Sequence, residues 1–379
     1  MDARISALKK RIGVTRLANI TGLDRLGYPV IAAMRPLSRN LSVSFGKGPT
    51  PQIASLSAVM EAAELFFSEH PPHTPVTATY AELADGSAIN PSFLHPIKID
   101  DDLESMPFDW VWGSYLTTKR PVLVPWDLIS MDYSMKAREK KRPFEFGATG
   151  LAAGFDETAA TLHGLYEVIE RNCHNEWNLS SDEKRADTLV DLDSVSCPEF
   201  RKQLDKIRSS GLDALAWDMT GLTGIPCYLV EVFDLAPGAT TAYVQGAAAN
   251  LSANSAIRMA LAEALQIRLT YISGSRDDLE WSDYGERYAE IVENREDILS
   301  GPVGGRLMPL EQAAEIPGSD LAEALQRLAE RGLGNVISVN LAGEEEPVRV
   351  VKVIVPLLKD IQDIGRKTDV AAATEQVFA

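Results

Sequence analysis

Cysteine is scarce in this sequence of 379 residues, which contains only Cys173, Cys197 and Cys227, far apart in the chain. An odd number of cysteines without a C-x-x-C pair argues against a zinc site or a disulfide framework, and makes the reducing cytoplasm the default compartment. No apolar run approaches the roughly 20 residues that span a membrane, and the segment after Met1 lacks the apolar stretch of a signal peptide. We therefore expect a cytoplasmic protein with no membrane partner.

Positive charge is also in deficit, because 37 Lys and Arg residues face 54 Asp and Glu residues, giving a formal net charge of −17. Surfaces that bind nucleic acids or anionic membranes need an excess of Lys and Arg, so neither partner is expected. Apolar residues make up 45% of the chain and charged residues 24%, as in ordinary globular proteins. The length suits one large domain or two to three lobes.

Several familiar catalytic motifs are missing. Gly46-Lys47-Gly48 lacks the spacing and the final Ser or Thr of a P-loop, and a surface turn is the commoner structure for such a tripeptide. No H-E-x-x-H, G-x-S-x-G or kinase motif occurs. The five histidines show no metal-ligand spacing; His163, four residues before Glu167, fits a partly buried histidine better than a ligand.

Three apolar segments each carry two polar residues three positions apart, a spacing that places both on one face of a helix. Between Ala58 and Phe67, for example, Glu61 and Glu64 are the only polar side chains. So apolar a helix is normally buried, and buried carboxylates need a partner or a metal ion. The three pairs are Glu61 and Glu64, Glu167 and Glu170, and Glu263 and Gln266.

Each pair taken alone fits a solvated helix face, and it is their number that favours one shared acidic site. Mutual repulsion between its carboxylates would require a divalent cation, for which Mg2+ with a nucleotide is the usual solution. Arg171 and Arg268 each follow a polar pair, and either could pair with carboxylates or hold phosphate oxygens. Spacing alone does not choose between these roles.

The pattern along the chain mixes helices and strands, which predicts an α/β or α+β fold. We expect helices over residues 2–12, 52–70, 198–209, 254–273 and 309–331, and the last of these should face solvent. Another helix should follow a small-residue turn at 147–154, with Asp156 near its N-cap. Expected strands cover 29–35, 41–45, 121–125 and 226–233, with a hairpin-like pattern around 119–121 and a hairpin over 335–355. Residues 136–143 form a basic run that we expect in an exposed loop.

The ordered motifs of residues 13–280 together resemble the YcaO-domain family. They comprise Gly13-Val-Thr-Arg16, Thr21–Val30, Gly46-Lys47-Gly48, Ser57–Glu64, Thr149–Gly154, His163–Arg171, Arg258–Arg268 and Ser275–Asp278. The resemblance implies a single YcaO-type domain over residues 1–379, with mixed sheets, buried acidic helices lining an ATP site, a C-terminal lobe over residues 281–379, and a homodimer.

Members of this family bind ATP without a P-loop, through acidic helices that hold Mg2+. They phosphorylate the oxygen of a peptide-backbone amide in a peptide or protein substrate. A neighbouring Cys, Ser or Thr side chain then closes an azoline ring, or an external sulfide donor gives a thioamide, often with a TfuA partner protein.

Carried over by motif position, the resemblance implies two groups of site residues. The Mg2+ ligands would be Glu61, Glu64, Glu167 and Glu170. The nucleotide contacts would be Lys47, Ser57, Arg171, Arg258, Glu263, Gln266 and Arg268.

The sequence departs from the family pattern at Leu65, where Arg is usual, at Phe155, where Asn is usual, and at Ala159, where an acidic residue is usual. Asp156 or Glu157 could compensate from the turn.

The alternative prediction is a non-catalytic accessory protein that keeps the fold without turnover. The last residues, Thr374 to Ala379, lack the Pro-rich tail of azoline-forming members, which favours thioamide formation, and the start near residue 13 suggests that a separate partner delivers the substrate.

Overall fold

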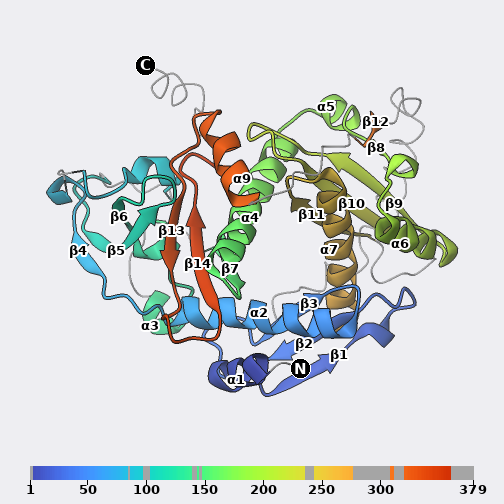
Figure 1. Cartoon of the computed structure of the whole chain (residues 1–379), viewed down its shortest axis with the longest axis horizontal. Coiled ribbons are helices and arrows are strands. Elements are labelled where there is room, and N and C mark those ends of the chain that lie inside the picture. The colour runs from blue at the N-terminus through green and yellow to red at the C-terminus, as the bar shows by residue number, and fades with distance from the viewer. Residues whose placement is uncertain are drawn as a thin grey trace.

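The computed structural model describes residues 3–83, 86–96, 103–138, 143–144, 147–234, 243–275, 308–310 and 320–359. Three long helices organise the molecule: α2 (Pro51–Glu69), α4 (Glu157–Asn178) and α7 (Ala253–Ser273). In Figure 1, α2 runs across the lower part of the view, above α1, β1 and β2, and the axes of α4 and α7 cross that of α2. Each helix packs on its own antiparallel sheet.

The N-terminal sheet supports α2. Its strand order is β1 (Arg16–Asn19), β2 (Val30–Met34), β3 (Val43–Lys47), and Lys47 at the end of β3 pairs with Val30. Helix α1 (Ala3–Ile12) packs against α2 and buries Ile5, Leu8 and Ile12.

The second sheet supports α4, which packs on its last two strands. Its order is β4 (Val76–Ala78), β5 (Phe108–Tyr115), β13 (Ile337–Asn340), β14 (Arg349–Ile354) and β7 (Leu151–Gly154), and β6 (Pro121–Pro125) pairs with β5. The third sheet supports α7, with order β11 (Tyr243–Ala249), β10 (Cys227–Asp234), β9 (Leu212–Asp218).

The shorter elements lie around these layers. They are α3 (Met135–Arg138), α5 (Asp182–Ala186), α6 (Pro198–Ser209), α9 (Asp320–Ala329), the parallel pair β8 (Val190–Asp191) and β12 (Met308–Pro309), and the 3-10 helices η1 (Thr21–Leu23), η2 (Ala81–Leu83), η3 (Pro91–Leu94), η4 (Trp126–Leu128) and η5 (Leu192–Ser194). Among the described residues, no helix combines the length and the hydropathy of a membrane span.

The three long helices begin in the same way. The side chains of Thr50, Asp156 and Ser252 occupy the N-cap and each accepts a hydrogen bond from the backbone N–H three residues later. Glu61, Glu167 and Glu263 each lie eleven residues after the cap. The polar pairs therefore sit at the same height, about three turns into each helix.

Glycine lets all three long helices lie close to a strand. A Cβ atom at Gly46 of β3 would stand 2.0 Å from the Ala58 nitrogen of α2, and one at Gly246 of β11 would stand 2.3 Å from the Ala264 nitrogen of α7. Alanines on the facing sides of both helices, such as Ala58 and Ala260, are fully buried. Helix α4 also approaches its sheet at a glycine, since a Cβ atom at Gly154 of β7 would stand 2.8 Å from the Ala160 nitrogen. It adds larger buried side chains such as Leu165 and Ile169, each worth about 1.5–3 kcal/mol on full burial.

The mixed fold of helices and antiparallel sheets is confirmed, as are the helices around 2–12, 52–70, 198–209 and 254–273, the strands at 121–125 and 226–233, and the hairpin of β13 and β14. Asp156 is the N-cap of α4, as predicted. Strands β1, β9 and β11 were not predicted, and Ala-rich β11 shows why, since Ala has low strand propensity and packing on α7 overrides it.

Three local predictions were wrong in part. Residues 151–154 form strand β7 rather than a turn, because β14 supplies a pairing edge. Helix α9 is not purely solvent-facing, since Ala324 and Leu328 are fully buried. The basic run begins in helix α3 and ends at a buried Pro143, while residues 139–142 lie outside the described residues.

We expect Gly246→Ala to lower the free energy of unfolding by about 2 kcal/mol or more, because the added methyl group collides with the backbone of α7. Urea denaturation would measure the change. Gly22→Ala is the matched control, since its Cβ meets nothing within 4 Å. Equal stability of the two variants would contradict this account of the contact between β11 and α7.

Candidate functional site

An ion pair joins two of the three helix–sheet units. The Lys47 ammonium at the end of β3 contacts the Glu263 carboxylate on α7. Both side chains stay partly accessible, at 26% and 33%. Burial alone would lower the pKa of Lys47, but Glu263, with Glu61 and Glu170 farther off, raises it. Burial would likewise raise the pKa of Glu263, and Lys47 reverses the sign and lowers it.

Glu64 connects α2 to the second sheet. Its Oε1 accepts a hydrogen bond of 2.7 Å from the Ala153 nitrogen of β7. Burial, together with the carboxylates of Glu61 and Glu167, nevertheless raises the pKa of Glu64 well above its usual value. Carboxyl groups of α2 and α4 therefore lie close enough to influence one another.

The α4 pair lies in the same place. Glu167 accepts a hydrogen bond of 3.1 Å from the Gly150 nitrogen, and the Arg171 guanidinium stands 3.7 Å from Glu167 and 3.9 Å from Glu170. Burial raises the pKa of Glu170 to about 8; Arg171 opposes this shift, and Glu263 and Glu167 add to it. One α4 residue thus interacts with the acidic residue of α7.

The structure therefore brings together the predicted acidic residues of all three helices, with Lys47 and Arg171 as the balancing cations. Among the described residues, no three Asp, Glu, His or Cys side chains are arranged to hold a metal ion as they stand. The donors still suit Mg2+, which prefers oxygen ligands and commonly takes one or two carboxylates while water and phosphate oxygens complete its shell. Burial is the largest cause of the raised pKa values of Glu64 and Glu170, and neighbouring carboxylates add to it. Five carboxyl groups, those of Glu61, Glu64, Glu167, Glu170 and Glu263, thus face two cations, Lys47 and Arg171.

Two further predicted residues lie near the cluster by their helix positions. Ser57 is about one turn before Glu61 on α2, and Gln266 is about one turn after Glu263 on α7. Both are partly accessible. Their nucleotide contacts stay predictions.

Two predicted arginines are placed elsewhere. Arg268 is 3% exposed, and its guanidinium pairs with Asp24 at 3.2 Å and Asp234 at 2.8 Å. Of the two roles left open by its spacing, this geometry favours pairing with carboxylates over phosphate binding. Arg258 lines a cavity beside Tyr28, on the side of α7 that faces α6.

His163 belongs to the site although its sequence position suggested a merely satisfied histidine. Its side chain reaches solvent, but desolvation by the surrounding protein and the charge of Lys47 lower its pKa, with an opposing effect from Glu263. Its spacing of four residues before Glu167 on α4 was the available signal. The backbone N–H groups of Gly150 and Ala153 also contact the site carboxylates, and they could not be predicted because any residue type offers the same backbone donor.

Two departures from the family pattern lie at the start of α4: Phe155 just before its N-cap and Ala159 in its first turn. Phe155 is 41% exposed, with the Arg4 guanidinium carbon 4.9 Å from the centroid of its ring, and Ala159 is exposed. The Asp156 carboxylate accepts a hydrogen bond of 2.8 Å from the Ala159 nitrogen. Asp156 is therefore engaged as the helix cap.

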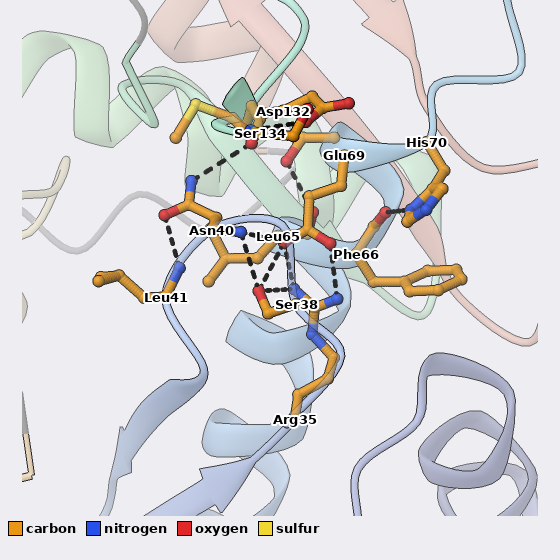
Figure 2. A network of polar contacts seen from close by, with 12 residues as sticks. Arg35, Ser38, Asn40, Leu41, Leu65, Phe66, Glu69, His70, Asp132 and Ser134 are labelled. Carbon is orange, nitrogen blue, oxygen red and sulfur yellow. Dashed lines mark hydrogen bonds and ion pairs between the residues drawn. The ribbon is translucent and has the colours of Figure 1, made fainter. Parts of the chain in front are cut away.

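The far end of α2 is anchored by a buried polar network, shown in Figure 2. Glu69, 2% exposed, receives two hydrogen bonds from the guanidinium of Arg35, at 2.5 and 2.7 Å. Ser38 and the Asn40 nitrogen donate to the same carboxylate at 2.7 and 3.1 Å. Removing one partner of such a buried pair costs about 3–5 kcal/mol, so this network fixes α2 against the loop that joins β2 and β3.

Comparison with known proteins identifies relatives of the whole architecture. Residues 45–359 match the family model described as YcaO cyclodehydratase, ATP- and Mg2+-binding. A Rhizobium leguminosarum bv. trifolii protein, named as an uncharacterized protein in the tfuA 3' region, is 31% identical over 367 residues, covering 92% of this chain and 84% of that protein.

Two solved structures share the fold. YcaO from Methanopyrus kandleri, bound with AMPPCP and Mg2+, has a TM-score of 0.65 and 21% identity, covering 92% of this chain and 87% of that one. A heterocyclase in complex with substrate and cofactor has a TM-score of 0.73 and 20% identity, covering 94% of this chain. This chain spans about half of that heterocyclase, 52% of its length.

In metal-free buffer, we expect the free energy of unfolding to fall as the pH rises from about 5 to 8. Glu170 ionises near its usual value of 4.5 when unfolded but at about 8 when folded, so the folded state holds the extra proton and loses stability as that proton leaves. Urea titrations across this range with Glu170→Gln should show a smaller fall than in the wild type. The exposed Glu183→Gln control should keep the wild-type slope, and an unchanged slope in Glu170→Gln would contradict the assignment.

Proposed function

Because this chain belongs to the YcaO family, we propose that it uses ATP to phosphorylate the oxygen of a backbone amide in a peptide or protein substrate. The observation that carries the proposal is the desolvated carboxylate cluster of α2, α4 and α7, whose charge is only partly balanced by Lys47 and Arg171. Such a cluster is suited to Mg2+ and a polyphosphate. Phosphoryl transfer depends chiefly on positioning and charge neutralisation, which these residues can supply.

ATP and Mg2+ are the cofactors of the domain to which this chain belongs. We propose Glu61, Glu64, Glu167 and Glu170 as the residues that hold Mg2+. When bound, Mg2+ supplies the positive charge that brings the polyphosphate to a carboxylate-rich surface.

Lys47 and Arg171 are the residues we propose for phosphate contacts, since both already lie among the carboxylates. Arg171 offers a planar fork of donors and Lys47 a compact charge. Ser57, Glu263 and Gln266 complete the proposed nucleotide site. Arg268 instead holds α7 against η1 and β10 through Asp24 and Asp234.

In the proposed reaction, ATP first activates the amide and a nucleophile then replaces the amide oxygen. The amide oxygen bonds to the terminal phosphorus of ATP and ADP leaves. A sulfide donor or a neighbouring side chain adds to the amide carbon, and phosphate then departs with the former amide oxygen. The amide oxygen is a poor leaving group until it is phosphorylated, which is why the step needs ATP.

Of the two products, we propose a thioamide formed with a TfuA-like partner. The support is the name of the Rhizobium relative, which places that protein in a tfuA 3' region. We also propose that the protein acts as a homodimer, and in the cytoplasm, where its three free cysteines would stay reduced.

A second candidate function is that of a non-catalytic accessory protein. The specific observation in its favour is the apolar surface formed by Phe155 and Ala159, where the family pattern has polar residues. This candidate predicts a folded protein that binds a partner and hydrolyses no ATP even when the partner is present.

Calorimetric titration of ATP with Mg2+ tests the nucleotide site. We expect binding by the wild type and affinity reduced about 100-fold or more in Glu61→Gln/Glu167→Gln, because a ligand should cost at least as much as the 10–100-fold typical of its hydrogen-bond partners. Glu183→Gln/Glu330→Gln, with the same charge change at exposed positions, is the control. Equal affinity in both double variants, with the fold verified by circular dichroism, would refute the site.

Mass spectrometry of a peptide incubated with the protein, ATP, Mg2+, sulfide and a TfuA-like partner distinguishes the products. Exchange of oxygen for sulfur raises the peptide mass, whereas ring formation lowers it by one water. We expect the increase. A loss of water without added sulfur would instead support azoline formation, and no change in mass despite ATP binding would favour the accessory function.

A further inference from the structure

A cavity of about 360 Å3 lies between α6 and α7, outside the carboxylate cluster. Its volume is within the range of small-ligand pockets. The floor is apolar and consists of the buried side chains of Phe200, Leu261 and Leu265. Such a floor can receive an aliphatic or aromatic group.

The polar lining of this cavity carries a net positive charge. Arg258 and Lys202 oppose the single carboxylate of Glu199, in a chain whose net charge is −17. Within the described part of the chain, Arg258 makes no hydrogen bond or ion pair. A guanidinium that is half-buried and open to a cavity favours an anionic ligand with a planar pair of acceptors, such as a carboxylate.

The cavity adjoins the proposed reaction site through two of its lining residues. Pro49 lies two positions after Lys47, the last residue of β3. Tyr28 is close enough to Lys47 and Arg258 for both charges to act on the pKa of its hydroxyl group. Lys47 itself contacts Glu263. A ligand in the cavity therefore lies beside the cation that links α7 to the cluster.

We propose that this cavity binds an acidic side chain of the substrate peptide, with Arg258 and Lys202 holding the carboxylate and an adjoining apolar residue on the Phe200 floor. The inference rests on the proposed function, since it takes the substrate to be a peptide. It assigns Arg258 to substrate selection instead of the phosphate contact expected from the motif. Substrates with Asp or Glu near the modified amide would then be preferred.

Two capped dipeptides test the cavity directly. N-acetyl-Leu-Glu-N-methylamide and N-acetyl-Leu-Gln-N-methylamide differ only in the charged group, and neither has a free terminal carboxylate. Saturation-transfer NMR titrations of the full chain, without nucleotide, should show the acidic probe binding about tenfold more tightly, as expected for one charge-assisted contact. Because these titrations need no ATP, their result is independent of whether the nucleotide site exists.

Arg258→Met and Lys202→Met should each reduce the preference for the acidic probe, with the larger loss in Arg258→Met. Lys206→Met is the matched control: it removes the same charge from α6 at an exposed residue outside the lining. Equal binding of the two probes to the wild type would overturn the inference. So would inorganic phosphate displacing the acidic probe at equal concentration, which indicates a free-anion site, or a fall in Mg2+–ATP affinity specific to Arg258→Met, which returns that residue to the nucleotide.

Discussion

Repulsion between carboxylates is the constraint around which this structure is built. Glu64 and Glu170 have raised pKa values because burial weakens their hydration and further carboxylates stand nearby. Left alone, such groups would separate or take up protons. Lys47, Arg171 and the backbone N–H groups of Gly150 and Ala153 hold them in place. The cluster keeps more carboxyl groups than cations, and this excess of negative charge supports the proposed site for Mg2+ and a nucleotide.

Rigidity of the surrounding scaffold makes that balance possible. Each of α2, α4 and α7 begins at an N-cap residue whose side chain accepts a backbone hydrogen bond. Helices α2 and α7 also lie against strands at glycine positions. The far end of α2 is tied down by the Arg35–Glu69 pair, and Arg268 ties α7 to Asp24 and Asp234. These contacts lie outside the cluster. They hold α2 and α7 in place, so that repulsion between the carboxylates does not move the helices apart.

Apolar periodicity was enough to predict the long helices and their polar pairs, because a buried helix with two carboxylates is an unusual pattern. The order of motifs then indicated the family. The sequence could not show which arginine lies at the site and which forms a structural ion pair. Arg171 and Arg268 follow equivalent pairs, yet one lies among the site carboxylates and the other pairs with residues far away in sequence. Strand β11 was also missed because its structure depends on contacts that are distant in sequence. Its alanines and glycine have low strand propensity, and packing on α7 stabilises the strand.

The equal interval between each N-cap and its first carboxylate makes chain length as important as residue identity. An α-helix turns by about 100° per residue. One residue inserted between Thr50 and Glu61, or between Ser252 and Glu263, would turn the carboxylate away from the cluster while leaving every motif residue present in the sequence. The helical geometry therefore tolerates a change of length only in the loops before the caps and in the segments beyond the polar pairs.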